Sequence, residues 1–180
     1  MNLEIHGKTA LIEAGSASIS DIERILKEIE GIGCFAQLCR LRPVAGLSHA
    51  AAALGQALSA IEQKNSFSKK PSLEFLLRLT GKRQIGKALA IAGLAEGKQN
   101  VLLAIAGKSR QEVNAAKTKI TELISFSGDK NAFAANASEN KRFIMKTFGI
   151  SDSFLKTLSD LPNPLESAAI ERTALLSLEV

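Results

Sequence analysis

Apolar residues along this chain recur with two periods, which predict strands in some segments and helices in others. Residues 3–14 alternate apolar and polar positions around His6 and Gly7, which predicts a β-hairpin. Apolar runs at 34–42 and 99–106 predict two further strands, and the second run is apolar enough to be buried on both faces. Helical spacing of the apolar residues predicts helices over 18–32, 48–63, 71–80, 84–92 and 109–126, and three more after residue 140.

Helices outnumber strands in this order and do not alternate regularly with them. The order indicates an α+β (mixed α/β) fold, in which about seven helices pack on a small four-stranded mixed or antiparallel sheet. A doubly wound nucleotide-binding sheet is disfavoured, because that fold alternates strands with helices. We expect residues 1–180 to form a single domain, with a mobile loop over residues 127–140, which are rich in Asn, Ser and Ala.

Residues at the ends of the predicted 71–80 helix have the chemistry of helix boundaries. Pro71 suits the first helical position, where a backbone N–H is not needed. Gly81 suits the left-handed residue that ends a helix. Between them, Glu74 and Arg78 stand four positions apart and predict a favourable ion pair on one helix face.

The few cysteines and histidines restrict the chemistry that the chain can perform. Cys34 and Cys39 are the only cysteines; on a strand their odd spacing places them on opposite faces, which predicts packing roles and no disulfide. His6 and His49 are the only histidines, and neither stands in a metal-binding or catalytic-triad pattern. We therefore expect no metal, no catalytic residue, no cofactor and no enzymatic activity.

The chain contains no segment typical of membrane insertion or secretion. Its apolar runs are far shorter than the roughly 18 residues that a membrane span needs. The first residues, M-N-L-E-I-H-G-K, lack the basic segment and apolar stretch of a secretory signal. These observations predict a cytoplasmic protein that does not bind membranes.

Positive charge is concentrated in one segment. The whole chain has a formal net charge of +5, whereas residues 64–87 alone hold seven basic residues and one acid, Glu74, and so carry +6. Residues 150–180 are acidic, with five acids and two bases. A basic patch on a near-neutral body favours a polyanionic partner, nucleic acid first. The alternative is a solvated helix face without a partner.

Residues 81–87, G-K-R-Q-I-G-K, match the G-x-x-x-x-G-K pattern of a phosphate-binding P-loop. The next residue is Ala88, where a P-loop has a Ser or Thr that binds Mg²⁺. A helix is predicted in front of the motif, where a P-loop has a strand. Nucleotide binding by Gly81–Lys87 is therefore an alternative function, although two features of a P-loop are missing.

The segment from Asn65 to Gly93, N-S-F-S-K-K-P-S-L-E-F-L-L-R-L-T-G-K-R-Q-I-G-K-A-L-A-I-A-G, resembles the signature of a known family. It is similar to the regulatory subunit of the KEOPS complex, the PRPK-binding-protein family, in its archaeal type. The order of the flanking elements extends the resemblance over nearly the whole chain. The positions that match the family signature are Lys69, Glu74, Leu76, Leu77, Leu79, Gly81, Arg83, Gln84, Ile85, Ala88 and Gly93.

This resemblance implies a non-catalytic subunit of a tRNA-modifying assembly. KEOPS installs the threonylcarbamoyl group on the adenosine next to the anticodon of ANN-decoding tRNAs. The family member binds the small PRPK-type kinase, an ATPase, and stimulates it; archaeal members also capture tRNA by its single-stranded 3′ CCA end. Contacts with other KEOPS subunits would be indirect, and no small-molecule substrate is implied.

Residues of the basic segment have the chemistry to bind a single-stranded RNA end. Such an end offers phosphates and unstacked bases. Basic side chains can bind the phosphates, Gln84 can bond a base edge through its amide, and Ile85 or Phe67 can pack against a base. Ile85 in the core and solvated lysines are the alternatives. The predicted RNA-binding residues are Lys69, Lys70, Arg83, Gln84 and Ile85.

The last predicted helix begins with Asn163 at the N-cap and Glu166 at the third helical position. Its apolar stripe either docks on the core of the protein or binds a partner helix. The resemblance favours the second role. The predicted kinase-interface residues are Ile170, Ala174, Leu175 and Leu178. A third function, a generic interaction scaffold without RNA binding, stays open.

Overall fold

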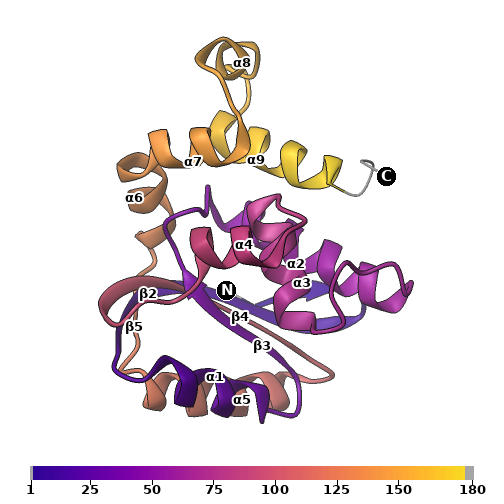
Figure 1. Ribbon diagram of the computed structural model, residues 1–180, viewed down its shortest axis with the longest axis vertical. Coiled ribbons are helices and arrows are strands. Elements are labelled where there is room, and N and C mark those ends of the chain that lie inside the picture. The colour runs from indigo at the N-terminus through magenta and orange to yellow at the C-terminus, as the bar shows by residue number, and fades with distance from the viewer. Residues whose placement is uncertain (1, 177–180) are drawn as a thin grey trace. The chain divides into compact units, whose positions relative to one another are not determined.

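The computed structural model describes residues 2–176 and has an α+β fold, which confirms the predicted class (Figure 1). The chain divides into two compact units. We call Met1–Leu41 with Gly93–Ala132 the sheet unit, and Arg42–Ala92 with Phe133–Val180 the helical unit. The single domain over residues 1–180 stays a prediction.

The sheet is antiparallel throughout. Its main path is β1-β2-β4-β3, formed by β1 (Asn2–Ile5), β2 (Lys8–Ile19), β4 (Gly97–Gly107) and β3 (Phe35–Arg40). A short fifth strand, β5 (Ser127–Gly128), pairs with Gly15 and Ser16 of β2, farther along that strand than the residues paired with β1. The predicted four strands are thus confirmed, and one two-residue strand is added to them.

The predicted hairpin turns at His6 and Gly7, which both have left-handed backbone, with φ of 49° and 68°. Two such residues form the tight turn that suits the twist of an antiparallel pair. The second strand of the hairpin is longer than predicted, because β2 stays paired with β4 as far as Ile19. The helix predicted from residue 18 therefore begins later, as α1 (Ile22–Glu30).

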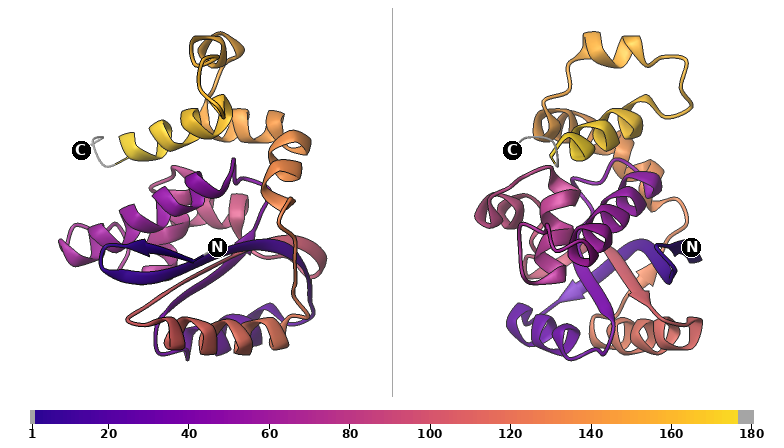
Figure 2. Two further views of the ribbon diagram at one scale, coloured as in Figure 1. Left: turned by 180° about the vertical axis from the view of Figure 1, so that it is seen from behind. Right: turned by 90° about the vertical axis from the view of Figure 1, so that its right-hand side faces the viewer.

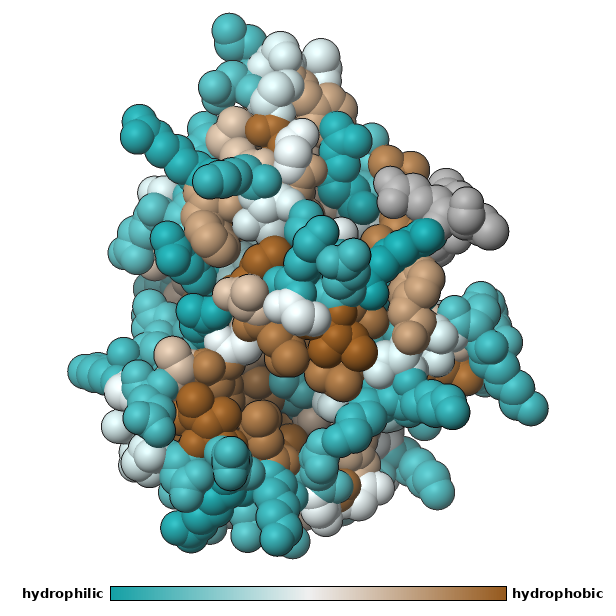
Figure 3. Space-filling view, in the orientation of Figure 1, coloured by the Kyte–Doolittle hydropathy of each residue, from teal (hydrophilic) through white to brown (hydrophobic). Residues whose placement is uncertain are grey.

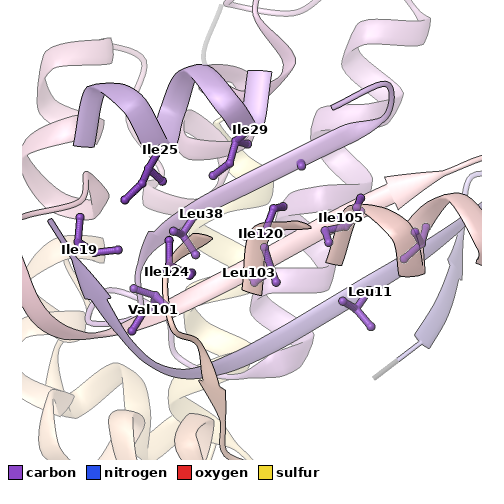
Figure 4. Packing of buried hydrophobic residues seen from close by; sticks show 14 residues of the cluster. Leu11, Ile19, Ile25, Ile29, Leu38, Val101, Leu103, Ile105, Ile120 and Ile124 are labelled. Carbon is purple, nitrogen blue, oxygen red and sulfur yellow. The ribbon is translucent and has the colours of Figure 1, made fainter. Parts of the chain in front are cut away.

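One face of the sheet is covered by α1 and α5 (Arg110–Leu123), which lie side by side in the right-hand view of Figure 2. Figure 4 shows the buried side chains of the cluster that these helices form with the strands. The Asp21 side chain accepts a hydrogen bond from the backbone N of Arg24 at 2.9 Å and so caps the start of α1. Alternate positions of the strands supply the other half of this core. Buried members of the cluster include Leu11, Ile19, Ile25, Ile29, Leu38, Val101, Leu103, Ile105, Ile120 and Ile124.

The helical unit is built on α2 (Leu47–Glu62), which packs against α3 (Pro71–Thr80) and α9 (Pro164–Leu175). The short α4 (Ile85–Ala92) packs on α3, and α7 (Lys141–Phe148) packs on α9. Between α7 and α9, α8 (Asp152–Thr157) stands on the far side of α9 from α2 (Figure 2). Both ends of α3 fall where the sequence predicted them.

The prediction of a mobile loop over residues 127–140 is wrong about the secondary structure, since the segment contains β5 and α6 (Ala132–Glu139). Ala132 and Asn136, one helical turn apart, are both buried. The Asn136 side chain donates to the backbone carbonyl of Val44 at 2.8 Å, so a polar residue occupies a buried helix position. A polar residue at this buried position conceals the helical periodicity. With α6 added to the eight helical segments predicted from the sequence, the described residues form nine helices.

The helices of the described residues are short. The longest is α2, with 16 residues. Within residues 2–176, none of the helices combines the length and the apolar character that crossing a membrane requires.

Candidate functional site

All five predicted RNA-binding residues lie on the helical unit, around α3. Lys69 and Lys70 precede this helix and are exposed. Arg83 and Gln84 follow it in the turn before α4 and are exposed as well. Ile85 is the first residue of α4 and keeps 40% of its surface accessible. We call these five residues, together with Phe67, the basic surface.

The loop before α3 is tied to the helix by backbone hydrogen bonds. The Ser68 backbone N donates to Glu74 Oε2 at 2.9 Å, and the Lys70 backbone N donates to Ser68 Oγ at 3.1 Å. Lys70 is the N-cap of α3, with an extended backbone. The loop therefore has a defined shape, although its lysines are exposed.

Phe67 joins the two ends of the basic surface. Its ring centroid lies 5.2 Å from Arg83 Cζ and 4.7 Å from Arg78 Cζ. Both distances fit cation–π contacts, and the ring remains 40% exposed. Phe67 thus brings the 65–70 loop, before α3, to the turn that follows α3.

The basic charge of the segment is distributed unevenly between surface and interior. Arg78 is 3% exposed and its Nε lies 2.9 Å from Oε1 of Glu74, which is fully buried. The predicted ion pair is therefore confirmed, but it is an interior pair. The charge that reaches the surface comes from the lysines and Arg83.

Two basic side chains of the 81–84 turn bind the ends of other helices. Lys82 Nζ donates to the Thr147 carbonyl at 2.8 Å, near the end of α7. Arg83 Nη2 donates to the Leu176 carbonyl at 3.2 Å, at the end of α9. Carbonyls in the last turn of a helix lack intrahelical partners and carry partial negative charge, so both contacts are favourable.

Apolar surface gathers on α4 beside these charges (Figure 3). Ile85 and Leu89 are 40% and 42% exposed, and as residues i and i+4 they share one helix face. The expectation that Ile85 could be a core residue is thus not met. Leu89 escaped the sequence analysis, although its spacing from Ile85 was a signal that could have identified it.

The surroundings of the G-x-x-x-x-G-K motif differ from those of a P-loop. The element before it is α3, a helix, where a P-loop follows a strand. Gly81 has φ of 63° and ends α3, while Gly86 lies inside α4. Residues 81–87 thus form a helix–turn–helix connection, and this geometry does not support the nucleotide-binding alternative.

The predicted kinase-interface residues lie on the flank of α9. Ile170 and Leu175 are half-buried and Ala174 is exposed, whereas Leu178 lies outside the described residues. The helix docks on its own unit through another stripe, which includes Ala169 and Thr173. One side of α9 therefore serves the core, and the neighbouring side is open to solvent.

His49 and both cysteines lie wholly or partly inside the protein, where burial shifts their pKa values. His49 is fully buried, its Nδ1 accepts from the Ala45 backbone N at 3.1 Å, and burial lowers its pKa to about 4. Burial raises the pKa of the Cys39 thiol to about 12 and also raises the pKa of Cys34. Among residues 2–176, no group of three or more His, Cys, Asp and Glu side chains is placed to hold a metal ion.

A family model described as kinase binding protein CGI-121 matches residues 17–177. The chain belongs to the CGI-121 family. This is the KEOPS regulatory-subunit, PRPK-binding family that the sequence resembled, so that prediction is confirmed; the archaeal type stays a prediction. No curated protein matches the chain.

The CGI-121 family is a family of kinase-binding proteins. Its match includes the basic segment and three of the four predicted kinase-interface residues, all but Leu178. In this CGI-121 member, the signature segment 65–93 forms the loop before α3, α3 itself, the following turn and α4. The segment therefore combines core residues with exposed ones. The exposed ones lie in the loop, in the turn and on α4, whereas α3 is largely buried.

Proposed function

We propose that this CGI-121 family member is a non-catalytic subunit of the KEOPS tRNA threonylcarbamoyladenosine-modification complex. In this role it binds and stimulates the small PRPK-type kinase and captures tRNA by its single-stranded 3′ CCA end. The match to a kinase-binding family over residues 17–177 supports the first activity. The composition of the basic surface supports the second.

The observation that carries RNA capture is the mixture of groups on the basic surface. Lys69, Lys70 and Arg83 offer cations to phosphates, and the half-exposed ring of Phe67 offers a face on which a base can stack. Arg83 donates one N–H to the Leu176 carbonyl, and a guanidinium has five N–H donors. Its remaining donors can bind a phosphate in the forked geometry that arginine favours.

The kinase surface is proposed on the open flank of α9. Ala174 is exposed there and Leu175 is half-buried, so a partner helix can pack against both without unfolding α9. Ile170 continues this flank one turn earlier. Leu178, the fourth residue of the prediction, stays part of the proposal.

RNA capture is tested by equilibrium binding of tRNA at near-physiological salt, with intact tRNA compared with tRNA trimmed of its 3′ CCA. We expect trimming to weaken binding. We also expect Arg83→Glu to weaken binding of the intact tRNA more than binding of the trimmed tRNA. Lys119→Glu, an equal charge change at an exposed position of α5, is the matched control. Equal, weak and salt-sensitive binding of both RNAs would contradict end capture and favour the scaffold alternative.

Kinase binding is tested by calorimetry with the purified PRPK-type kinase. Ala174→Glu places a charge on the open flank of α9 and should weaken the complex. Ala115→Glu, at an exposed position of α5, should leave it unchanged. A protein that binds neither kinase nor tRNA would overturn the proposed function.

A further inference from the structure

Glu74 and Arg78 form a buried ion pair directly beneath the basic surface. The Arg78 Nε and Glu74 Oε1 atoms are 2.9 Å apart, and the two side chains are 3% and 0% exposed. A buried ion pair commonly stabilises a fold no better than two apolar side chains of similar volume, because both charges lose their hydration. Stability alone therefore does not explain why a charged pair occupies this position.

Each partner of the pair reaches a different part of the loop before α3. Arg78 Nε donates to Glu74 Oε1, and the other oxygen of this carboxylate, Oε2, accepts from the Ser68 backbone N at 2.9 Å. The Arg78 guanidinium lies over the ring of Phe67, with its Cζ 4.7 Å from the ring centroid. The pair thus holds two consecutive residues of this loop, one by its backbone and one by its side chain.

The other neighbour of the Phe67 ring is Arg83, whose Cζ lies 5.2 Å from the centroid. Contacts therefore run without a break from Glu74 through Arg78 and Phe67 to Arg83. The loop that carries Lys69 and Lys70 is fixed by the same carboxylate, through Ser68. One buried pair accordingly sets the positions of groups that precede and follow α3.

We infer that Glu74 and Arg78 are positioning residues for RNA. They hold Phe67 and the 65–70 loop in place beside Arg83. This inference rests on the proposed capture of a single-stranded RNA end. The pair adds no net charge to the surface and lies too deep to touch RNA. The pair contributes to the preference for an RNA with an intact single-stranded end over one that lacks it. It does not contribute to the general attraction between cations and phosphates.

The double variant Glu74→Leu with Arg78→Met tests this role. It removes one acid and one base, so the net charge is unchanged, and it fills the site with apolar side chains of similar size. It also removes the acceptor of Ser68 and the guanidinium over Phe67. The matched control is Glu13→Leu with Lys117→Met, which removes an ion pair of 2.7 Å in the sheet unit.

The measurement is the ratio of the affinities for intact tRNA and for tRNA lacking its 3′ CCA. We expect the Glu74/Arg78 double variant to lower this ratio by about fivefold or more, the lower range of what stacking one base on an aromatic ring contributes. The salt dependence of binding should stay that of the wild type, because the exposed cations are the same. The control pair should change neither quantity.

Arg78→Lys keeps the inference testable if the double variant does not fold. It retains a cation beside Glu74 but removes the planar guanidinium from Phe67, so the ratio should again fall. A folded variant with the wild-type ratio would show that the pair is only structural, and would overturn the inference while RNA capture stands. A wild-type protein without any preference for the intact end would overturn the proposed function itself.

Discussion

Oε1 of Glu166 lies 3.1 Å from the backbone N of His49, so a carboxylate of α9 caps the first turn of α2. The N-cap of α2 is Gly46, which has no side chain to do so. Glu166 is 9% exposed and stands at the positive end of the α2 dipole, where a negative charge is favourable. The two helices are therefore joined by an electrostatic contact between residues 117 positions apart.

Replacement of Glu166 should destabilise the protein. Glu166→Ala leaves the buried N–H of His49 without its acceptor and removes the charge at the helix end, which together should cost about 1–3 kcal/mol. Urea unfolding of the whole chain measures this loss. Glu171→Ala, at an exposed position of the same helix, is the control and should change the free energy of unfolding by less than about 0.5 kcal/mol.

A side chain at Gly46 should displace the Glu166 carboxylate. A Cβ at this position would overlap that carboxylate, which would have to leave its place beside the His49 backbone N. Gly46→Ala should therefore destabilise the protein, and the double variant with Glu166→Ala should lose less than the sum of the two single changes. Strict additivity in a double-mutant cycle by urea unfolding would contradict this steric explanation.

Stability should fall as the pH is lowered from about 6.5 to about 4. An unfolded histidine has a pKa near 6.5, whereas burial lowers the pKa of His49 in the folded protein to about 4. Between these values the unfolded state binds a proton that the folded state does not, which favours unfolding by roughly 3 kcal/mol at most.

The measurement is the free energy of unfolding across this pH range for the wild type and for His49→Gln. The variant should be less stable at pH 7, where it loses the packing of the ring on Phe148, but its stability should fall less steeply towards pH 4. His6→Gln, at an exposed turn, is the control and should keep the wild-type slope. A wild-type slope in His49→Gln would assign the acid sensitivity to other groups.

The two cysteines should differ in reactivity. Cys39 is fully buried in β3 with its pKa raised to about 12, whereas Cys34 is only partly buried beside the core of the sheet unit. A thiol reagent at pH 8 should therefore label Cys34 in the folded protein and reach Cys39 only on unfolding. Mass spectrometry of peptides after timed labelling separates the two sites. Equal labelling rates without denaturant would contradict this assignment.

Local chemistry made several elements predictable from sequence. Pro71 and Gly81 bound α3 because each has a backbone preference that acts within its own turn, and Asp21 caps α1 for the same kind of reason. The odd spacing of Cys34 and Cys39 likewise predicted opposite faces: Cys34 packs on the cluster beneath α1 and α5, and Cys39 does not belong to that cluster.

What could not be predicted depends on contacts between distant segments. Glu166 was expected to serve the start of its own helix, and instead it accepts from His49. Arg78 was counted with the basic patch, yet its charge is buried beside Glu74. The site residues were proposed from their chemistry, but the contact between Phe67 and Arg83 required the fold, because it depends on how the 65–70 loop returns along α3.

The contact of Arg83 with Leu176 should make the end of α9 sensitive to changes in the 81–84 turn. Arg83 Nη2 donates to the Leu176 carbonyl at 3.2 Å, and this carbonyl lies at the C-terminal end of α9, where intrahelical donors are lacking. Arg83→Gln shortens the side chain and removes the charge, so the last turn of α9 should open more often.

Amide hydrogen exchange of residues 173–176 should accelerate by about three- to tenfold, as expected for the loss of one partly exposed charged hydrogen bond. Gln84→Ala, at the next and likewise exposed position, is the matched control and should leave the exchange unchanged. Unchanged exchange in Arg83→Gln would mean that the contact contributes nothing to the order of α9, and the helix end would then be held by the packing of Thr173 and Leu176 alone.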